Sequence, residues 1–210
     1  MSSYKKGEVS LQTTFYPTAD TWFDGYFAEN NYGARTTLEC DQAALVRFDV
    51  SSIPAGTQIS AAQLRITKTV SPRSSYAPTF YVYSVSNANS GWIEGTKNAT
   101  RAGAGEPCLE ALEADGAGGV TTAWDSGGNF NAATDTENVT LASKAINRAD
   151  DANTTYHLDF NNDGLTRIEG WFGSPNTNYG ICLKWALDLR FASRENATED
   201  YRPMLTLTYS

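Results

Sequence analysis

The segment 43–67 limits the fold more than any other part of the chain, because it reads as two strands joined by a short turn. In the first strand, every second residue is apolar, which places these side chains on one face: Ala44, Val46, Phe48 and Val50. Pro54 and Gly56 then favour a turn. A second strand follows at once, with its own apolar face: Ala62, Leu64 and Ile66. The pattern predicts an antiparallel β-sandwich of two sheets, with Phe48 in its core.

Length and composition fit one domain of this all-β class. A chain of 210 residues lies within the range of a single sandwich. Its 5 Trp, 11 Tyr, 9 Phe and 17 Gly favour strands and turns over long helices. We therefore predict a single domain over 1–210, with an N-terminal arm at 1–8 and a long loop insertion, rich in Gly, Ala and Asp, at about 96–135.

One short helix is predicted, near 163–172. Its apolar residues fall on one side at helical spacing, and they are Leu165, Ile168 and either Trp171 or Phe172. Asp163 can cap the first turn, because its side chain can accept a hydrogen bond from a backbone N–H.

Several short motifs extend this picture over most of the chain. In order, they are Ala19-Asp20-Thr21-Trp22-Phe23, Asn31-Tyr32-Gly33, the segment 44–66, Leu158-Asp159-Phe160, the helix ending near Trp171, Asn178-Tyr179-Gly180, Phe191-Ala192-Ser193-Arg194-Glu195 and the strand after Arg202-Pro203. In this order and spacing the chain resembles the DNRLRE-domain proteins, β-sandwich modules related to a carbohydrate-binding module family and to the disaggregatase-related repeats. The resemblance implies a jelly-roll-like sandwich without catalytic machinery, usually attached to extracellular enzymes or surface proteins, and binding polysaccharide where tested. It is weakest over 95–150.

The net charge of −8 narrows the classes of partner. Duplex nucleic acid and anionic membranes need clustered Lys and Arg, so we expect neither nucleic-acid binding nor membrane insertion. A polyanionic glycan is disfavoured for the same reason, unless basic residues gather around Arg65, Lys68 and Arg73. A neutral glycan or a protein surface fits the charge better.

The N-terminal sequence shows no apolar run of signal-peptide length. Three explanations are open: a module excised from a secreted protein, export by another route, or a viral structural protein released by lysis. The third is favoured, because the sequence reads as complete from its Met to its last strand. We expect the protein outside the cell or on a virion surface.

The cysteines are Cys40, Cys108 and Cys182, an odd number that cannot pair completely within the chain. This count favours reduced thiols, with Cys182 as a core residue. A bridge between Cys40 and Cys182 is the alternative.

Catalysis finds little support in the sequence, and we predict no enzyme activity. His157 and Asp159 share one face of an alternating segment, which is either a base with an orienting carboxylate or a polar pair on a solvent-facing strand. The second interpretation is favoured. No nucleophile elbow, phosphate-binding loop or zinc motif occurs in the sequence.

Asp159, Asn161 and Asp163 match the start of a calcium loop, with Gly164 at the sharp turn. The match fails at its last position, which is Gly170 rather than an acid. The two readings left open are a structural calcium site and a strand, turn and helix cap in succession.

Aromatic residues near loops are the candidates for ligand contact, because a ring stacks on the apolar face of a sugar while polar neighbours bind its hydroxyls. Trp92, Trp124 and Phe130 lie in Gly-rich sequence, and Tyr26 and Phe27 lie beside Asn30, Asn31 and Tyr32. Each ring has a core role as its alternative, Trp92 above all.

Two functions therefore stand from the sequence. The first is a non-catalytic glycan-binding or adhesion module. The second is a virion structural or decoration protein, or a surface-layer component, that assembles with capsid or layer subunits through the same sandwich.

Overall fold

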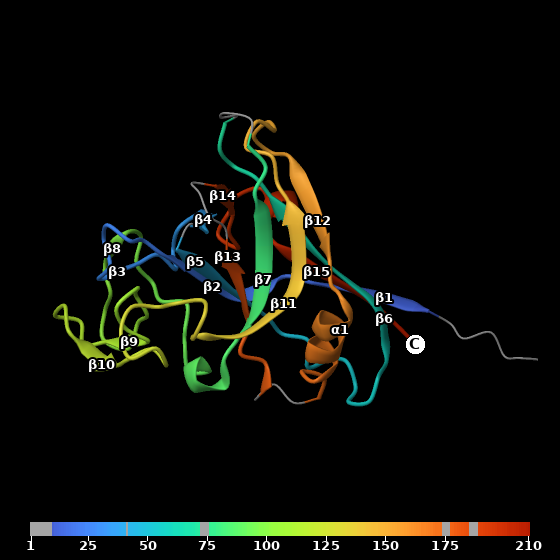
Figure 1. The fold of residues 1–210 in the computed structure, drawn as a ribbon, viewed down its shortest axis with the longest axis horizontal. Coiled ribbons are helices and arrows are strands. Elements are labelled where there is room, and N and C mark those ends of the chain that lie inside the picture. The colour runs from blue at the N-terminus through green and yellow to red at the C-terminus, as the bar shows by residue number, and fades with distance from the viewer. Residues whose placement is uncertain (1–9, 41, 72–75, 174–176, 185–188) are drawn as a thin grey trace, which may run out of the picture.

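Two antiparallel sheets face one another in the computed structural model, which describes residues 10–40, 42–71, 76–173, 177–184 and 189–210 (Figure 1). The four-stranded sheet has the order β1 (Leu11–Phe15), β15 (Met204–Tyr209), β6 (Ile59–Thr67) and β12 (Thr155–Asp159). The five-stranded sheet has the order β11 (Thr136–Ala145), β7 (Thr79–Val85), β13 (Ile181–Lys184), β5 (Ala43–Phe48) and β2 (Pro17–Phe23). The predicted all-β sandwich is confirmed, and the predicted arm at 1–8 lies outside the described residues.

Short elements complete the fold. Three further strand pairs are β3 (Asn30–Asn31) with β8 (Thr100–Arg101), β4 (Thr37–Glu39) with β14 (Arg190–Ala192), and β9 (Glu113–Ala114) with β10 (Val120–Thr122). Within the described residues, the helical segments are α1 (Asn162–Glu169) and two 3₁₀ turns, Asn87–Asn89 and Glu199–Tyr201. Among the described residues, no helix has the length and apolar character needed to cross a membrane.

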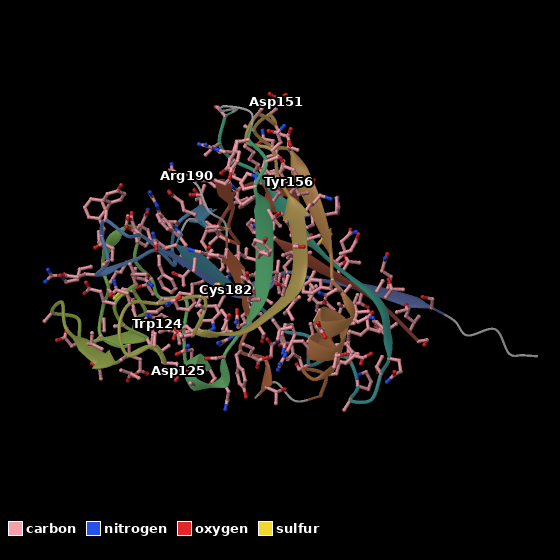
Figure 2. All side chains as sticks on the ribbon, viewed as in Figure 1. Trp124, Asp125, Asp151, Tyr156, Cys182 and Arg190 are labelled. Carbon is pink, nitrogen blue, oxygen red and sulfur yellow. The ribbon has the colours of Figure 1, made fainter. Side chains whose placement is uncertain are left out.

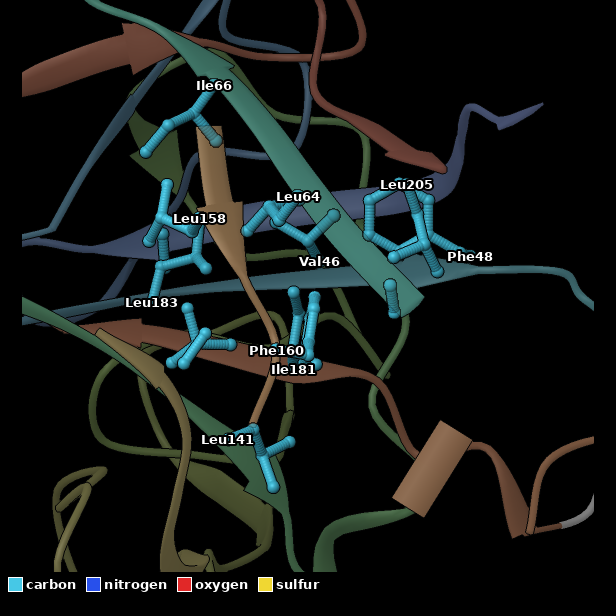
Figure 3. Close-up of a cluster of buried hydrophobic side chains, with 14 of the residues drawn as sticks. Val46, Phe48, Leu64, Ile66, Leu141, Leu158, Phe160, Ile181, Leu183 and Leu205 are labelled. Carbon is cyan, nitrogen blue, oxygen red and sulfur yellow. The ribbon is translucent and has the colours of Figure 1, made fainter. Parts of the chain in front are cut away.

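The main core fills the space between the two sheets. Phe48 is 2% exposed there, as the alternating pattern predicts. Figure 3 shows side chains of both sheets meeting in this cluster: Val46, Phe48, Ile181, Leu183 and Leu141 from one, and Leu64, Ile66, Leu158 and Leu205 from the other. Strands β5 and β6 are neighbours in sequence but belong to opposite sheets, so the turn between them is a corner of the sandwich. Several such crossings between sheets are typical of jelly rolls.

The five-stranded sheet is partly buried on its second face as well. Residues 86–135 fold against that face, on the side of the sandwich away from α1 (Figure 1). Their apolar side chains pack on sheet residues that include Phe23, Leu45 and Cys182. The insertion predicted at 96–135 is therefore no simple exposed loop, because the sheet face beneath it is apolar and requires cover. Its exposed residues include 115–121 and 125–129.

Helix α1 begins slightly earlier than predicted, and its cap is Asn161 rather than Asp163. The Asn161 side-chain oxygen accepts a hydrogen bond from the Gly164 N–H at 2.9 Å. The apolar side of the helical region faces the main core, where Ile168 and Trp171 are buried. Gly164 permits this close packing, since a Cβ at that position would lie 2.7 Å from the Leu141 carbonyl oxygen.

Candidate binding cleft

An open cleft of about 570 Å³ lies where the end of β2 meets the β3 and β4 region and β14. Its lining combines aromatic, charged and amide side chains: Trp22, Asp24, Tyr26, Phe27, Asn30, Tyr32, Arg35, Glu39, Ala99 and Arg190. Tyr26 is 94% exposed and Phe27 is 62% exposed, so both predicted rings are free to contact a ligand. Figure 2 labels Arg190 on β14, which closes the cleft from a distant part of the chain.

The turn after β2 holds these two rings outward. The Asp24 side-chain oxygen Oδ1 accepts hydrogen bonds from the backbone N–H groups of Tyr26, at 2.7 Å, and Phe27, at 3.3 Å. The Asn30 N–H then donates to the Phe27 carbonyl oxygen at 3.0 Å. An Asp at the start of a turn favours this local geometry, because its side chain replaces a backbone acceptor. The backbone conformation of this turn therefore keeps the side chains of Tyr26 and Phe27 exposed.

The base of the cleft is a pair of packed rings. The ring centroids of Trp22 and Tyr32 are 4.0 Å apart, and both side chains are 2% exposed. The Tyr32 hydroxyl donates a hydrogen bond to Asp24 Oδ2 at 3.1 Å. Burial, together with the negative charge of Asp24, raises the pKa of Tyr32 to about 12. Tyr32 therefore keeps its proton over the physiological range and holds Asp24 in place.

Charged groups line the cleft in equal numbers of each sign. Arg190 Nε contacts Glu39 Oε1 at 2.7 Å, across the β4–β14 pair. Arg35 Nη1 donates to the Asn98 side-chain oxygen at 3.3 Å. With Asp24 as the second acid, the lining carries no formal net charge. The surface thus offers exposed rings beside donors and acceptors, which is the combination that a neutral sugar requires.

The other three predicted ligand rings are core residues. Trp124 is 1% exposed, Trp92 is 0% exposed and Phe130 is 7% exposed, within the cluster that covers the second face of the five-stranded sheet. Figure 2 shows Trp124 beside that sheet, near Cys182. The indole N–H of Trp92 donates to the Tyr179 carbonyl oxygen at 2.7 Å. Their assignment to a ligand surface is therefore wrong, because no ring face is open for stacking.

The run predicted as a calcium loop has helix-cap geometry. Asn161 caps α1, and its Nδ2 also donates to the Thr140 carbonyl oxygen at 2.7 Å. Asp159 Oδ1 accepts from Gln63 Nε2 at 2.7 Å, and Asp163 lies in the first turn of the helix. These contacts match the alternative of a strand, turn and cap, and calcium binding by Asp159, Asn161 and Asp163 stays a prediction.

The cap reading gives a specific expectation for Asn161→Ala. Loss of a side-chain cap costs about 0.5–2 kcal/mol, so the variant should unfold at a slightly lower urea concentration than the parent. The shift should be the same with calcium and with chelator, as measured by circular dichroism. A shift seen only in the presence of calcium would show that Asn161 is a metal ligand instead.

His157 lies on an exposed strand face, whereas Cys182 is buried in the second apolar cluster. His157 Nδ1 lies 2.7 Å from Gln63 Oε1, so Gln63 stands between His157 and Asp159 on the exposed face of β12 and β6. Burial raises the pKa of Cys182 to about 12, which removes its thiolate character. Cys40 packs in the main core, whereas Cys182 packs in the second cluster.

Sequence reasoning missed the charged part of the cleft. Arg35 and Glu39 follow the Asn31-Tyr32-Gly33 motif closely, and their proximity to Tyr26 and Phe27 was the one local signal. Arg190 gave no such signal, because only the pairing of β4 with β14 brings it to the cleft.

Residues 11–108 match carbohydrate-binding module family 96. A search of curated proteins finds no match to the chain. Every residue that lines the cleft lies within the matched range, except Arg190. The match supports the carbohydrate-binding part of the resemblance, while the relation to DNRLRE domains and disaggregatase repeats stays a prediction. Over this range, which is just under half of the chain, the protein is similar to a family of carbohydrate-binding modules.

Proposed function

We propose that this protein is a non-catalytic glycan-binding module, and that the glycan occupies the cleft with a sugar ring stacked on Tyr26 and Phe27. The observation that carries the proposal is the pair of exposed rings, 94% and 62% accessible, on a cleft within the matched residues. Adjacent exposed rings that line a cleft are typical of a ligand-binding surface.

A neutral polysaccharide fits this cleft best. The two acids and two arginines cancel, and Glu39 with Arg190 already forms an ion pair. Sugar hydroxyls can donate to the carboxylates and accept from the guanidinium groups without removing a charge from its partner. We propose that the protein meets this polysaccharide outside the cell or on a virion surface.

Replacing Tyr26 or Phe27 with alanine should weaken glycan binding. Each ring is expected to contribute about 1.4 kcal/mol or more, which corresponds to about a tenfold higher Kd. Affinity electrophoresis in gels that contain a neutral polysaccharide measures the retention, with a polyanionic polysaccharide in a parallel gel. The unfolding midpoint should hardly change, because both side chains are exposed.

Tyr16→Ala is the matched control, since Tyr16 is 43% exposed just before β2, at the opposite end of that strand from the cleft. It should bind as the parent does. Unchanged retention in Tyr26→Ala and Phe27→Ala would remove the cleft as the binding site. Stronger retention by the polyanionic gel would overturn the assignment to a neutral glycan.

A further inference from the structure

Three carboxylates from distant parts of the chain converge beside the edge strand β2. They are Asp20 of β2, Glu94 in the segment after Trp92, and Glu195 in the loop after β14. One ligand oxygen from each lies within 4.8 Å of the others. Asp20 is 1% exposed, so this group of acids is not an ordinary solvated surface cluster.

The hydrogen bonds inside the cluster leave two oxygens unused. Asp20 Oδ2 accepts from the Arg194 N–H at 2.7 Å, and the Asp20 N–H donates to Glu94 Oε1 at 2.8 Å. Arg194 Nη1 contacts Glu94 Oε2 at 2.5 Å and Glu195 Oε1 at 3.2 Å. Asp20 Oδ1 and Glu195 Oε2 are buried and accept no hydrogen bond from a donor within the described part of the chain, and the two carboxyl groups lie close enough to share a proton. A buried carboxylate oxygen without a partner is costly.

The charges are unbalanced as well. Three carboxylates face one guanidinium, so two negative charges remain in excess. Burial raises the pKa of Asp20 well above its usual range, and the neighbouring charge of Glu195 adds to the effect. Burial is also the first cause of the raised pKa of Glu94. Either a proton or a cation must compensate such a group.

We propose that Asp20, Glu94 and Glu195 bind one Ca²⁺ ion. The cluster presents only oxygen ligands, which hard cations prefer, and a divalent ion cancels the excess of two charges. Oxygens at about 2.3–2.6 Å from one Ca²⁺ lie up to about 5 Å apart, which accommodates the observed spacing. Mg²⁺ keeps several water molecules in its shell, and the buried oxygens leave little room for them.

The ion would join three segments that lie far apart in the sequence. Strand β2 is the edge of the five-stranded sheet, Glu94 stands at the base of the segment 86–135, and Glu195 belongs to the C-terminal part of the chain. A shared ion therefore links β2 both to the segment 86–135 and to the loop that contains Glu195. Because the unfolded chain cannot assemble these ligands, binding stabilises the native state by mass action.

The full-length protein, stripped with EDTA and transferred to metal-free buffer, is titrated with CaCl₂ by isothermal calorimetry. We expect one ion per chain. At a hundredfold excess of Ca²⁺ over its Kd, the melting temperature should rise by about 5–10 °C. Mg²⁺ at the same concentration should give a clearly smaller rise.

Glu195→Gln and Asp20→Asn should abolish both the binding heat and the melting shift. Asp151→Asn is the matched control, because it removes one exposed carboxylate that belongs to neither calcium candidate and should leave binding intact. The melting shift of the parent can be measured even if Asp20→Asn fails to fold. The proposal is overturned if the parent binds no Ca²⁺ at millimolar concentration, if Glu195→Gln still binds, or if Mg²⁺ gives an equal shift. A metal-independent rise in stability of Glu195→Gln, without binding in the parent, would indicate a shared proton instead.

Discussion

Trp124→Ala should lower the free energy of unfolding by about 3–5 kcal/mol and leave glycan retention unchanged. Trp124 is 1% exposed, and its ring packs edge-on against Phe23 and Phe130 with centroid distances of 5.3 Å and 4.9 Å. Its indole N–H donates to the Cys108 carbonyl oxygen at 2.9 Å, and this acceptor loses its donor in the variant. Truncation therefore combines a cavity with an unpaired buried carbonyl.

Urea denaturation followed by circular dichroism gives the loss of stability, and affinity electrophoresis below the melting temperature gives the retention. Val120→Ala is the control within the same insertion, since Val120 is 50% exposed, and its effect should stay within about 0.5 kcal/mol. A Trp124→Ala variant of parental stability that no longer binds glycan would place the ring at the ligand after all.

The strands were predictable because every second side chain along them is a buried apolar one. In β5, the residues Ala44, Val46 and Phe48 point into the main core, and in β6 the residues Leu64 and Ile66 do the same. This alternation follows from the pleat of a strand, so it is visible without any tertiary information. The helix was predictable for a related reason, since Ile168 and Trp171 are spaced to share one side.

The second apolar layer was not predictable from such a pattern. Leu45 lies on the strand face that alternation assigns to the outside, yet it is 0% exposed. Its cover comes from a cluster that includes Leu109, Leu112 and Trp124, and Gly-rich sequence at 115–119 separates the two leucines from Trp124. Local sequence predicts a loop there, whereas the demand for burial comes from the sheet.

The cleft also has one part that the sequence predicted and one part that it did not. Tyr26 and Phe27 were found because two adjacent rings beside polar residues suit a sugar, and the Asp24 turn exposes both. The ion pair of Glu39 with Arg190 depends on a strand pairing that joins distant parts of the chain. No spacing within the sequence indicates that contact.

Asn31→Ala should also cost about 3–5 kcal/mol, although it removes only a small polar side chain. Asn31 is 0% exposed, and its Nδ2 donates to the carbonyl oxygens of Glu94, at 2.9 Å, and Pro107, at 3.0 Å. Its Oδ1 accepts from the N–H groups of Gly33 and Lys97, both at 3.1 Å. Each buried group left without a partner costs about 1–3 kcal/mol, and the four losses are not additive because they share one site.

The neighbouring Asn30→Ala is the matched comparison, since the Asn30 side chain is only part-buried where it donates to the Ala99 carbonyl oxygen at 3.2 Å. It should cost no more than about 1.5 kcal/mol. Proteolysis under native conditions provides a second readout, because Asn31 fastens residues 94–97 to β3 and its loss should open that segment to cleavage. Equal stability of the two variants, with residues 94–97 still protected, would show that water replaces the Asn31 side chain and that this motif contributes little to the fold.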